Sequence, residues 1–223
     1  MGFADLLIRL RIGYDTESGR HVGKTIMGFI RDVADNESET LAEERGSFPA
    51  WGKSDYAESG QKFRNACRLT VAPTGTISML ADTSSGVEPT FALAWKKMNI
   101  LEGETLYYVN KYFQRDAEKY GFYSESLMDH ISNGGSIKSR SDVPDWVKEV
   151  YTTATDISPE AHVGMQAAFQ GACDSGISKT INFANDATIE DVYTAYMLAW
   201  ESDCKGITVY RSGSRDKEVL VRA

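Results

Sequence analysis

The chain of 223 residues is long enough for one large domain or for one piece of a larger one. Its hydrophobic content of 42% and charged content of 25% are typical of a soluble globular protein, and its net charge of −8 argues against a general nucleic-acid-binding surface. No apolar run approaches the roughly 18 residues of a membrane span, and residues 1–8 lack the features of a signal peptide.

The cysteines and histidines are few and scattered. Cys67, Cys173 and Cys204 form an odd, widely spaced set, which predicts a reducing compartment and therefore a cytoplasmic location. The three histidines form no cluster with the cysteines at metal-ligand spacing. We therefore expect no metal site in this chain.

The first third of the chain is predicted to be mainly helical. Residues 3–10 are apolar enough for a buried helix or strand. Apolar residues at every third or fourth position predict a long helix from residue 16 to about 44, with a potential interruption at residues 35–38. The members of this apolar stripe are Val22, Ile26, Ile30 and Val33. A loop containing Gly and Ser follows to about residue 60.

Residues 64–78 are the most informative segment of the chain. Leu69 and Val71 predict a strand that breaks at Pro73, and residues 74–76 (Thr-Gly-Thr) form a small turn before an apolar segment that opens a helix. Such a turn leaves consecutive backbone N–H groups unpaired, which makes it a candidate site for phosphate. The absence of lysine rules out the GxxxxGK[ST] nucleotide loop. An ordinary strand-turn-helix corner remains the alternative.

The candidate phosphate site comprises five residues. These are Thr74, Gly75, Thr76, Ile77 and Ser78. Backbone amides supply its main donors, and the hydroxyl groups of its two threonines and its serine are candidates for additional donors.

The middle of the chain predicts alternating loops and short elements. The expected order is a polar turn at residues 82–89, a strand at 91–100, helices at 104–120 and 124–132, and a short helix at 144–152.

The last third predicts a βαβ unit. Ser158 is a helix N-cap followed by proline, and the helix that it starts runs to about residue 173. A strand at residues 178–183 is followed by a helix that begins after Thr188, ends at residues 205–206 and is followed by a second strand at 207–210. Ile189, Val192, Tyr196 and Ala199 are expected on one face of that helix. This order predicts an α/β fold with parallel strands.

Several polar residues have both a functional and a structural interpretation. Those with a possible ligand role are Arg64, Asn65, Glu88, Lys179, Asn182, Tyr210 and Arg211. The alternative for Glu88, which precedes Pro89, is a turn-forming role, and the alternatives for the others are capping, pairing or packing. His162 and Cys204 fit structural roles better, and no catalytic triad is apparent.

Considered together, the motifs are much more specific. The sequence resembles the large subunit of ribonucleotide reductases, and most of all the adenosylcobalamin-dependent class II. The resemblance rests on residues 64–66, 72–78, 85–89, 156–160, 166–170, 178–182, 186–188 and 204–211, and on the opening residues 1–7. It extends over nearly the whole chain, so residues 1–223 are expected to be a single region.

The resemblance implies a fold, a substrate site and a cofactor. It implies the C-terminal part, about half, of a ten-stranded α/β barrel with flanking helices. The turn at residues 74–78 would bind the substrate's diphosphate, and Tyr210 would lie near the active site. The complete enzyme would use adenosylcobalamin to generate a cysteine thiyl radical that starts reduction of a ribonucleotide to a 2′-deoxyribonucleotide.

The sequence also departs from the family. The Asn-x-Cys-x-Glu loop that carries the radical cysteine and the usual C-terminal cysteine pair are both missing, and residues 183–184 (Phe-Ala) replace a more usual Leu-Pro. No catalytic residue is therefore expected in this chain. A separate N-terminal chain is the expected partner, either in a naturally divided reductase, which Met1 at the head of a family-like segment favours, or because the chain is truncated.

Two alternatives to this function remain. One is a non-catalytic nucleotide-binding or assembly module derived from the family. The other is a glycyl-radical enzyme of the same barrel type, against which the absence of a C-terminal glycyl-radical segment argues. Base preference, diphosphate or triphosphate substrate and any higher oligomer stay open.

Overall fold

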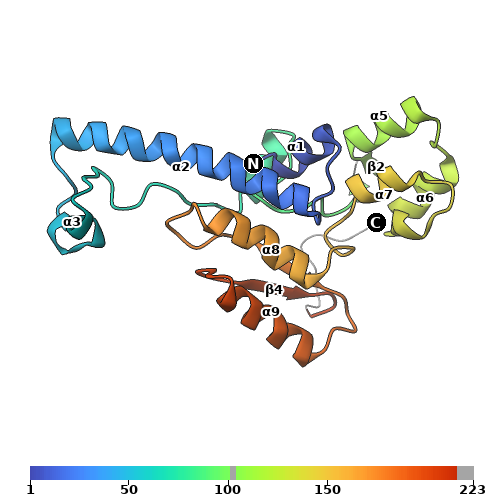
Figure 1. Ribbon diagram of the computed structural model, residues 1–223. Coiled ribbons are helices and arrows are strands. Elements are labelled where there is room, and N and C mark those ends of the chain that lie inside the picture. The colour runs from blue at the N-terminus through green and yellow to red at the C-terminus, as the bar shows by residue number, and fades with distance from the viewer. Residues whose placement is uncertain (101–103, 215–223) are drawn as a thin grey trace.

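The computed structural model describes residues 1–100 and 104–214. Helix α2 (Glu17–Arg45) runs along one side of the molecule, and α3 (Asp55–Ser59) lies near its C-terminal end (Figure 1). Helix α8 (Pro159–Gln170) lies under α2, and α9 (Ile189–Glu201) lies under α8 (Figure 1). Within the described residues, no helix is both long and apolar enough to cross a membrane.

The other helices are α1 (Phe3–Leu10), α4 (Gly75–Leu80), α5 (Lys111–Tyr120), α6 (Glu125–Ser132) and α7 (Asp145–Val150), with 3-10 turns at Trp51–Lys53 and Ile137–Ser139. Helices α1, α5, α6 and α7 lie toward the other end of α2 (Figure 1). The strands are β1 (Ala94–Ile100), β2 (Glu104–Val109), β3 (Thr180–Phe183) and β4 (Thr208–Arg211).

Helix α2 is uninterrupted, so the break considered at residues 35–38 does not occur. The helix begins after Thr16, whose hydroxyl accepts from Gly19 N at 3.0 Å. Asp35 is held by Arg31 at 2.6 Å and by Arg68, and the pairing keeps this polar stretch helical. Only the N-terminal half of the predicted apolar stripe is covered, because α8 packs there, while Ile30 and Val33 remain exposed.

The helix expected at residues 104–120 is wrong over its first six residues. The structure places β2 there, paired antiparallel with β1 from Ala94↔Val109 to Ile100↔Glu104, and α5 begins only after Asn110. Residues 105–109 (Thr-Leu-Tyr-Tyr-Val) are rich in β-branched and aromatic types, and the neighbouring strand gives them a partner. Cross-strand pairing therefore overrides the helical interpretation.

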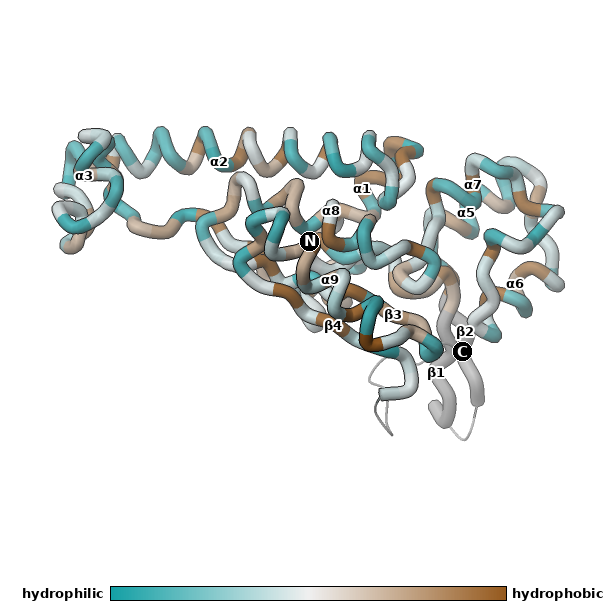
Figure 2. Tube along the Cα trace, turned by 60° about the horizontal axis from the view of Figure 1, so that its bottom comes forward, coloured by the Kyte–Doolittle hydropathy of each residue, from teal (hydrophilic) through white to brown (hydrophobic). Residues whose placement is uncertain are grey.

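The parallel βαβ unit is confirmed. Strands β3 and β4 pair parallel from Thr180↔Thr208 to Phe183↔Arg211, and α9 connects them. The strand expected before Pro73 is reduced to one parallel bridge, Val71↔Ile177. The α/β class with parallel strands and flanking helices is thus observed, and Figure 2 shows β3 and β4 beside α9.

Helix α9 differs from expectation in its buried face and its end. Ala199 is buried, whereas Ile189 is 86% and Tyr196 46% exposed, so the predicted four-residue stripe does not face inward as a whole. The helix ends at Glu201, and the left-handed residue that closes it is Asp203 (φ 55°) instead of the Lys205-Gly206 pair. The bond from Cys204 N to Ala199 O completes this earlier cap.

Three hydrophobic clusters form the core of the described part of the chain. One joins α5, α6 and α7, a second joins α1, α2 and α8, and a third joins β3 to the inner face of α9. The second cluster includes Phe3 and Phe169, whose rings meet edge to face at 4.9 Å. It also contains Val71 and Val87, which flank the predicted phosphate turn on either side in the sequence.

Candidate functional site: the turn at the start of helix α4

Helix α4 begins with an unusual cap. Thr74 is its N-cap residue, has a left-handed backbone (φ 51°, ψ 27°), and makes no side-chain cap to the helix. A β-branched residue rarely adopts this conformation, so surrounding contacts must hold it. Its hydroxyl oxygen instead accepts from Gly86 N at 2.7 Å.

The first amides of α4 are open. The first backbone bond into the helix is Ser78 N to Thr74 O at 3.0 Å, and within the described part of the chain no acceptor lies on the amides of Gly75, Thr76 or Ile77. All three residues are exposed, and a Cβ added to Gly75 would meet nothing within 4 Å. The turn therefore presents three consecutive donors toward open space.

Of the three hydroxyl groups proposed as extra donors, two serve the turn itself. Ser78 is buried, and its Oγ donates to Gly75 O at 2.9 Å and lies 2.5 Å from Ser85 Oγ. The Thr74 hydroxyl is engaged with Gly86. Thr76 is exposed, so its hydroxyl lies open beside the amides, and the Thr74 hydroxyl, which accepts from Gly86, still has its proton to donate.

The segment from Thr83 to Glu88 supports this turn from behind. Thr83 N donates to Ser78 O at 3.0 Å. Gly86 has φ 46°, and a Cβ there would lie 2.9 Å from Ala72 O, so only glycine fits without a shift. Tyr14 fixes the same segment through a 2.5 Å bond from its hydroxyl to Val87 O, and burial raises the pKa of that hydroxyl.

Glu88 connects the supporting segment to strand β3. Its Oε2 accepts from Lys179 Nζ and its Oε1 from Thr180 N, at 2.8 and 2.7 Å. The Lys179 side chain is fully buried, and burial lowers its pKa while Glu88 opposes the change. Of the two polar strand residues, Lys179 thus faces an internal partner, and the turn interpretation of Glu88 is too limited.

His162 completes a buried polar cluster. Its Nδ1 lies 2.8 Å from Lys179 Nζ, and its Nε2 lies 2.9 Å from Ala154 O. Burial, with the charge of Lys179, lowers the pKa of His162 from 6.5 to about 3. The neutral ring therefore accepts at Nδ1 and donates at Nε2, which is the structural role expected for it.

The candidates on the β3–β4 pair lie apart from these contacts. Asn182 pairs in register with Tyr210, and both are half-buried. Arg211 Nε donates to Ala187 O at 3.1 Å, which favours its structural interpretation. Cys204 is partly buried, and burial raises the pKa of its thiol.

Arg64 and Asn65 are structural. Asn65 Oδ1 accepts from the buried Ser38 at 3.1 Å, and Arg64 reaches Gly46 O at 3.4 Å. A neighbouring charged cluster was not anticipated from the sequence: Asp174 receives the amides of Arg68 and Leu69 at 2.7 and 2.9 Å. Asp174 anchors the segment that leads to the phosphate turn. The sequence shows only Arg68 before the alternating apolar residues Leu69 and Val71, which does not point to Asp174 as their partner.

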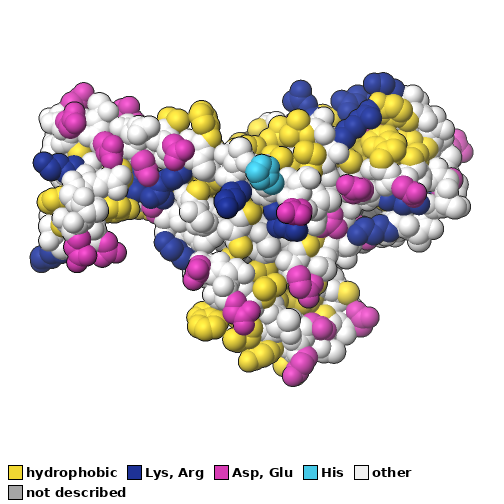
Figure 3. Space-filling model, in the orientation of Figure 1, with side chains coloured by type: hydrophobic (Ala, Val, Ile, Leu, Met, Phe, Trp, Pro, Cys, Tyr) yellow, Lys and Arg dark blue, Asp and Glu magenta, His cyan; other side chains and the backbone are white. Residues whose placement is uncertain are grey.

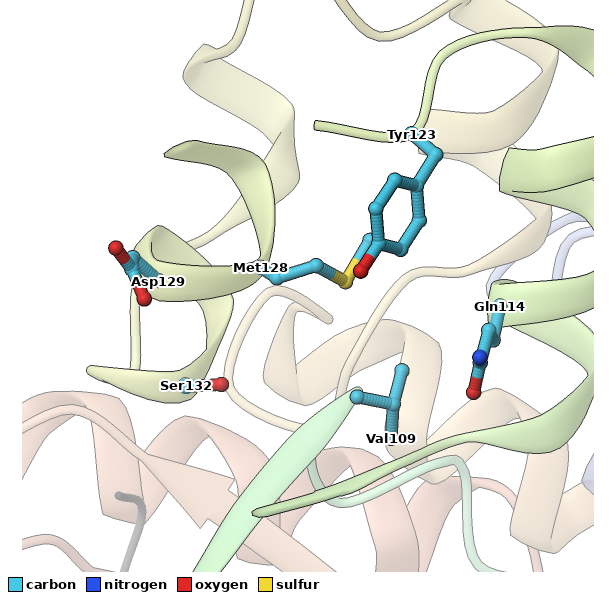
Figure 4. A pocket seen from close by; sticks show the side chains of 6 residues that line it. All are labelled: Val109, Gln114, Tyr123, Met128, Asp129 and Ser132. Atoms are coloured by element: carbon cyan, nitrogen blue, oxygen red, sulfur yellow. The ribbon is translucent and has the colours of Figure 1, made fainter. Parts of the chain in front are cut away.

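Two cavities elsewhere are poor sites for an anion. One of about 200 Å³ lies between β2, α5 and α6, where Tyr123 and Met128 lie together and the carboxyl group of Asp129 points away from them (Figure 4). The other, about 350 Å³, lies at the carboxyl end of β3 and is lined by three acidic residues, Glu160, Asp186 and Asp191. Neither has a basic residue in its lining.

No metal centre is found in the described parts of the chain. Residues 1–100 and 104–214 contain no group of three or more His, Cys, Asp or Glu residues that could hold an ion. The three cysteines are free thiols.

Comparison with known proteins gives consistent matches. The family model "Ribonucleotide reductase, barrel domain" matches residues 1–63 and 59–210. The chain is 46% identical over 99% of its length to a vitamin B12-dependent ribonucleoside-diphosphate reductase of Thermoplasma acidophilum, and 43% identical over its whole length to one of Mycobacterium tuberculosis. It spans 28% and 32% of these two relatives.

A solved structure supports the fold. The alpha subunit of the class Id ribonucleotide reductase of Actinobacillus ureae superposes with a TM-score of 0.79 at 23% identity, over 96% of this chain and 38% of that one. The parallel strands and flanking helices are therefore part of an α/β barrel.

Proposed function

This chain belongs to the ribonucleotide reductase barrel-domain family, and we propose that it is the part of such an enzyme that binds the substrate's phosphates. The substrate class is a ribonucleotide, with a diphosphate favoured by the names of the relatives. The chain spans about 30% of those relatives, so reduction to the 2′-deoxyribonucleotide is an activity of the complete enzyme. Residues 1–223 act as one region of its barrel domain.

The observation that carries the proposal is the row of open amides at Gly75, Thr76 and Ile77. Consecutive amides at a helix start suit the several oxygens of a diphosphate, and the positive end of the helix dipole favours its charge. The Thr76 hydroxyl adds a donor at the edge of the turn. The supporting segment at residues 83–88 preorganises the turn, because Gly86 and Ser85 hold Thr74 and Ser78.

The reacting groups of the complete enzyme are placed outside this region. In the proposed reaction, a cysteine thiyl radical removes the 3′ hydrogen, the 2′-hydroxyl leaves as water, and two thiols supply two electrons as they become a disulfide. Burial raises the pKa of the thiols of Cys173 and Cys204, and within residues 1–100 and 104–214 neither cysteine is hydrogen-bonded to the turn. We therefore assign the radical cysteine and the two reducing cysteines to the N-terminal part of the enzyme, on a separate chain or on more of the same polypeptide.

Adenosylcobalamin would supply the initial radical by cleavage of its cobalt–carbon bond. Neither of the two cavities described above, at about 200 and 350 Å³, offers a site for a corrin ring. His162 is buried with both ring nitrogens engaged and is no candidate for a cobalt ligand. We therefore place the cofactor on the remainder of the enzyme.

Exposed apolar faces support the need for a partner. Helix α9 presents Tyr193 and Trp200 at 62% and 72% exposure, and α4 presents Met79 and Leu80 at 74% and 84%. Figure 3 shows apolar side chains gathered over the lower part of the molecule, where Figure 1 places α9. A helix that is apolar on both faces is normally buried. We propose that the N-terminal part of the reductase covers these faces.

Reconstitution tests the function directly. The chain is mixed with the N-terminal part of a related vitamin B12-dependent reductase, adenosylcobalamin, a dithiol and a ribonucleoside diphosphate, and deoxyribonucleotide is measured. We expect turnover only in the complete mixture. Diphosphate binding without turnover in any combination would support the non-catalytic binding module instead, and no binding at all would contradict both.

A further inference from the structure

Strand β3 has an unusual partner on its outer edge. Ser178 N donates to Val71 O at 3.0 Å, and two residues later Thr180 N donates to Glu88 Oε1 at 2.7 Å. Alternate residues of a strand direct their amides to the same edge. The carboxylate of Glu88 therefore continues the ladder where the preceding strand has ended.

The same carboxylate is fixed by a fully satisfied lysine. Lys179 Nζ donates to Glu88 Oε2, His162 Nδ1 and Thr180 O at 2.8, 2.8 and 2.5 Å. An ammonium group has three donors, and all three are used inside the protein. Lys179 is thus not available to a ligand, and its contacts leave Glu88 little freedom to move.

Glu88 is also the end of the segment that supports the phosphate turn. Two residues before it, Gly86 N donates to Thr74 Oγ1, and Ser85 Oγ meets Ser78 Oγ. Ser85 O in turn accepts from Glu88 N at 3.0 Å. A short series of hydrogen bonds therefore links β3, through Glu88, to both ends of the turn.

We propose that Glu88 is a positioning residue for the phosphate site: its carboxylate, held by Lys179 and Thr180, fixes the supporting segment and so the directions of the amides of Gly75 to Ile77. The proposal rests on the function proposed above. Glu88 acts through other groups and touches no substrate atom. Its loss is expected to weaken phosphate binding in the ground state and the transition state alike, so KM rises in the complete enzyme while kcat changes little.

The role of Lys179 follows from charge. The carboxylate of Glu88 lies in the segment behind an anion site, and Lys179 neutralises it. Removing only one member of a buried pair leaves an uncompensated charge, whereas apolar replacement of both members is often tolerated. Comparing a variant that loses one member of the Glu88–Lys179 pair with a variant that loses both therefore separates the effect on protein stability from the effect on the position of the phosphate turn.

The test is a ¹H–¹⁵N NMR titration of the 223-residue chain with inorganic pyrophosphate, combined with thermal melts. The variants are Glu88→Gln and the double variant Glu88→Met/Lys179→Met. Tyr151→Phe is the matched control, because it removes the buried 2.7 Å bond to Asp116 in the α5–α7 cluster, which has no part in the turn.

We expect the ligand-free amide signals of Gly75, Thr76 and Ile77 to move in both Glu88 variants, and the pyrophosphate Kd to rise about tenfold. In the double variant the melting temperature recovers in part, because the unpaired charge is gone but Thr180 N and His162 Nδ1 lose their partners, while the Kd stays weak. Tyr151→Phe lowers the melting temperature and leaves the amide signals of the turn and the pyrophosphate Kd at wild-type values. Folded Glu88 variants with wild-type amide signals would overturn the proposal.

Failure of the function itself gives a different result. If pyrophosphate moves no amide of the wild-type turn, the phosphate site is wrong. The ligand-free signals of the Glu88 variants still decide whether Glu88 positions the turn.

Discussion

The amide of Gly86 donates to the hydroxyl oxygen of Thr74 at 2.7 Å and joins the start of α4 to a second turn twelve residues later in the chain. This contact holds Thr74 at φ 51°, a conformation that costs a β-branched residue free energy. The open amides of the phosphate turn thus depend on a bond that is not local in the sequence.

Thr74→Val is expected to release this contact. Valine keeps the shape and the β-branch but leaves the partly buried Gly86 amide without an acceptor, which should lower the free energy of unfolding by about 1–3 kcal/mol. Urea denaturation measures the change. Thr76→Val is the matched control, since Thr76 is exposed, and it should change stability by less than about 0.5 kcal/mol. Equal losses in the two variants would contradict the assigned role of Thr74.

Gly75→Asp is expected to weaken phosphate binding without unfolding the chain. A Cβ at this position meets nothing within 4 Å, so the folded state accommodates the side chain. The added carboxylate lies beside the open amides and repels an anion, which should raise the pyrophosphate Kd by about tenfold, equivalent to ~1.4 kcal/mol.

Calorimetry of the Gly75 variant needs a charge-matched control. Gly52→Asp adds the same charge at another glycine with open space around it, in the 3-10 turn at Trp51–Lys53. That variant should bind pyrophosphate like the wild type. A wild-type Kd in Gly75→Asp would remove the phosphate assignment from this turn.

The stability of the chain should fall as the pH falls below about 6.5, in part because of His162. Its pKa is about 3 in the folded chain and 6.5 for an unperturbed histidine such as that of the unfolded chain, so between these values the unfolded chain binds more protons than the folded one. The stability contribution is complete above pH ~6.5 and decreases by up to ~1.4 kcal/mol per pH unit below it.

His162→Gln isolates this contribution. Glutamine keeps an acceptor for Lys179 and a donor for Ala154 but does not titrate, so the loss of stability between about pH 6.5 and 4 should be shallower than in the wild type. Urea denaturation at several pH values gives the two slopes. His21→Gln, on the exposed face of α2, controls for loss of a histidine as such. Indistinguishable slopes for the wild type and His162→Gln would refute the assignment.

Local chemistry predicted much of this structure. The N-caps expected at Ser158 and Thr188 are both present, because a side-chain oxygen beside free amides needs no distant partner. The turn at residues 74–76 likewise follows from small residues after Pro73. Parallel pairing of β3 and β4 followed from the strand-helix-strand order.

The errors arise where distant contacts decide. Residues 104–109 form a strand because β1 lies beside them. The pattern of apolar residues within one segment does not show which other segment will pair with it. Glu88, Lys179 and His162 meet from three separate segments, so no spacing in the sequence could reveal that their charges and lone pairs satisfy one another. The apolar spacing of Ile189, Val192, Tyr196 and Ala199 predicted a shared face of α9, but spacing alone does not say which part of such a face is covered within this chain.

The exposed face of α9 gives a prediction about the partner. Tyr193→Ser/Trp200→Ser removes two large side chains that are 62% and 72% exposed. Stability of the chain alone should change little, because neither ring is buried here, while affinity for the N-terminal part of the reductase should fall at least about tenfold if the rings enter its interface. Co-purification and calorimetry with that part measure the loss. Tyr123→Ser, at 49% exposure beside α6, is the matched control and should leave association unchanged. Unaltered association of the α9 variant would show that this face lies outside the interface, and the remaining apolar residues of α4, Met79 and Leu80, would then be the next surface to test.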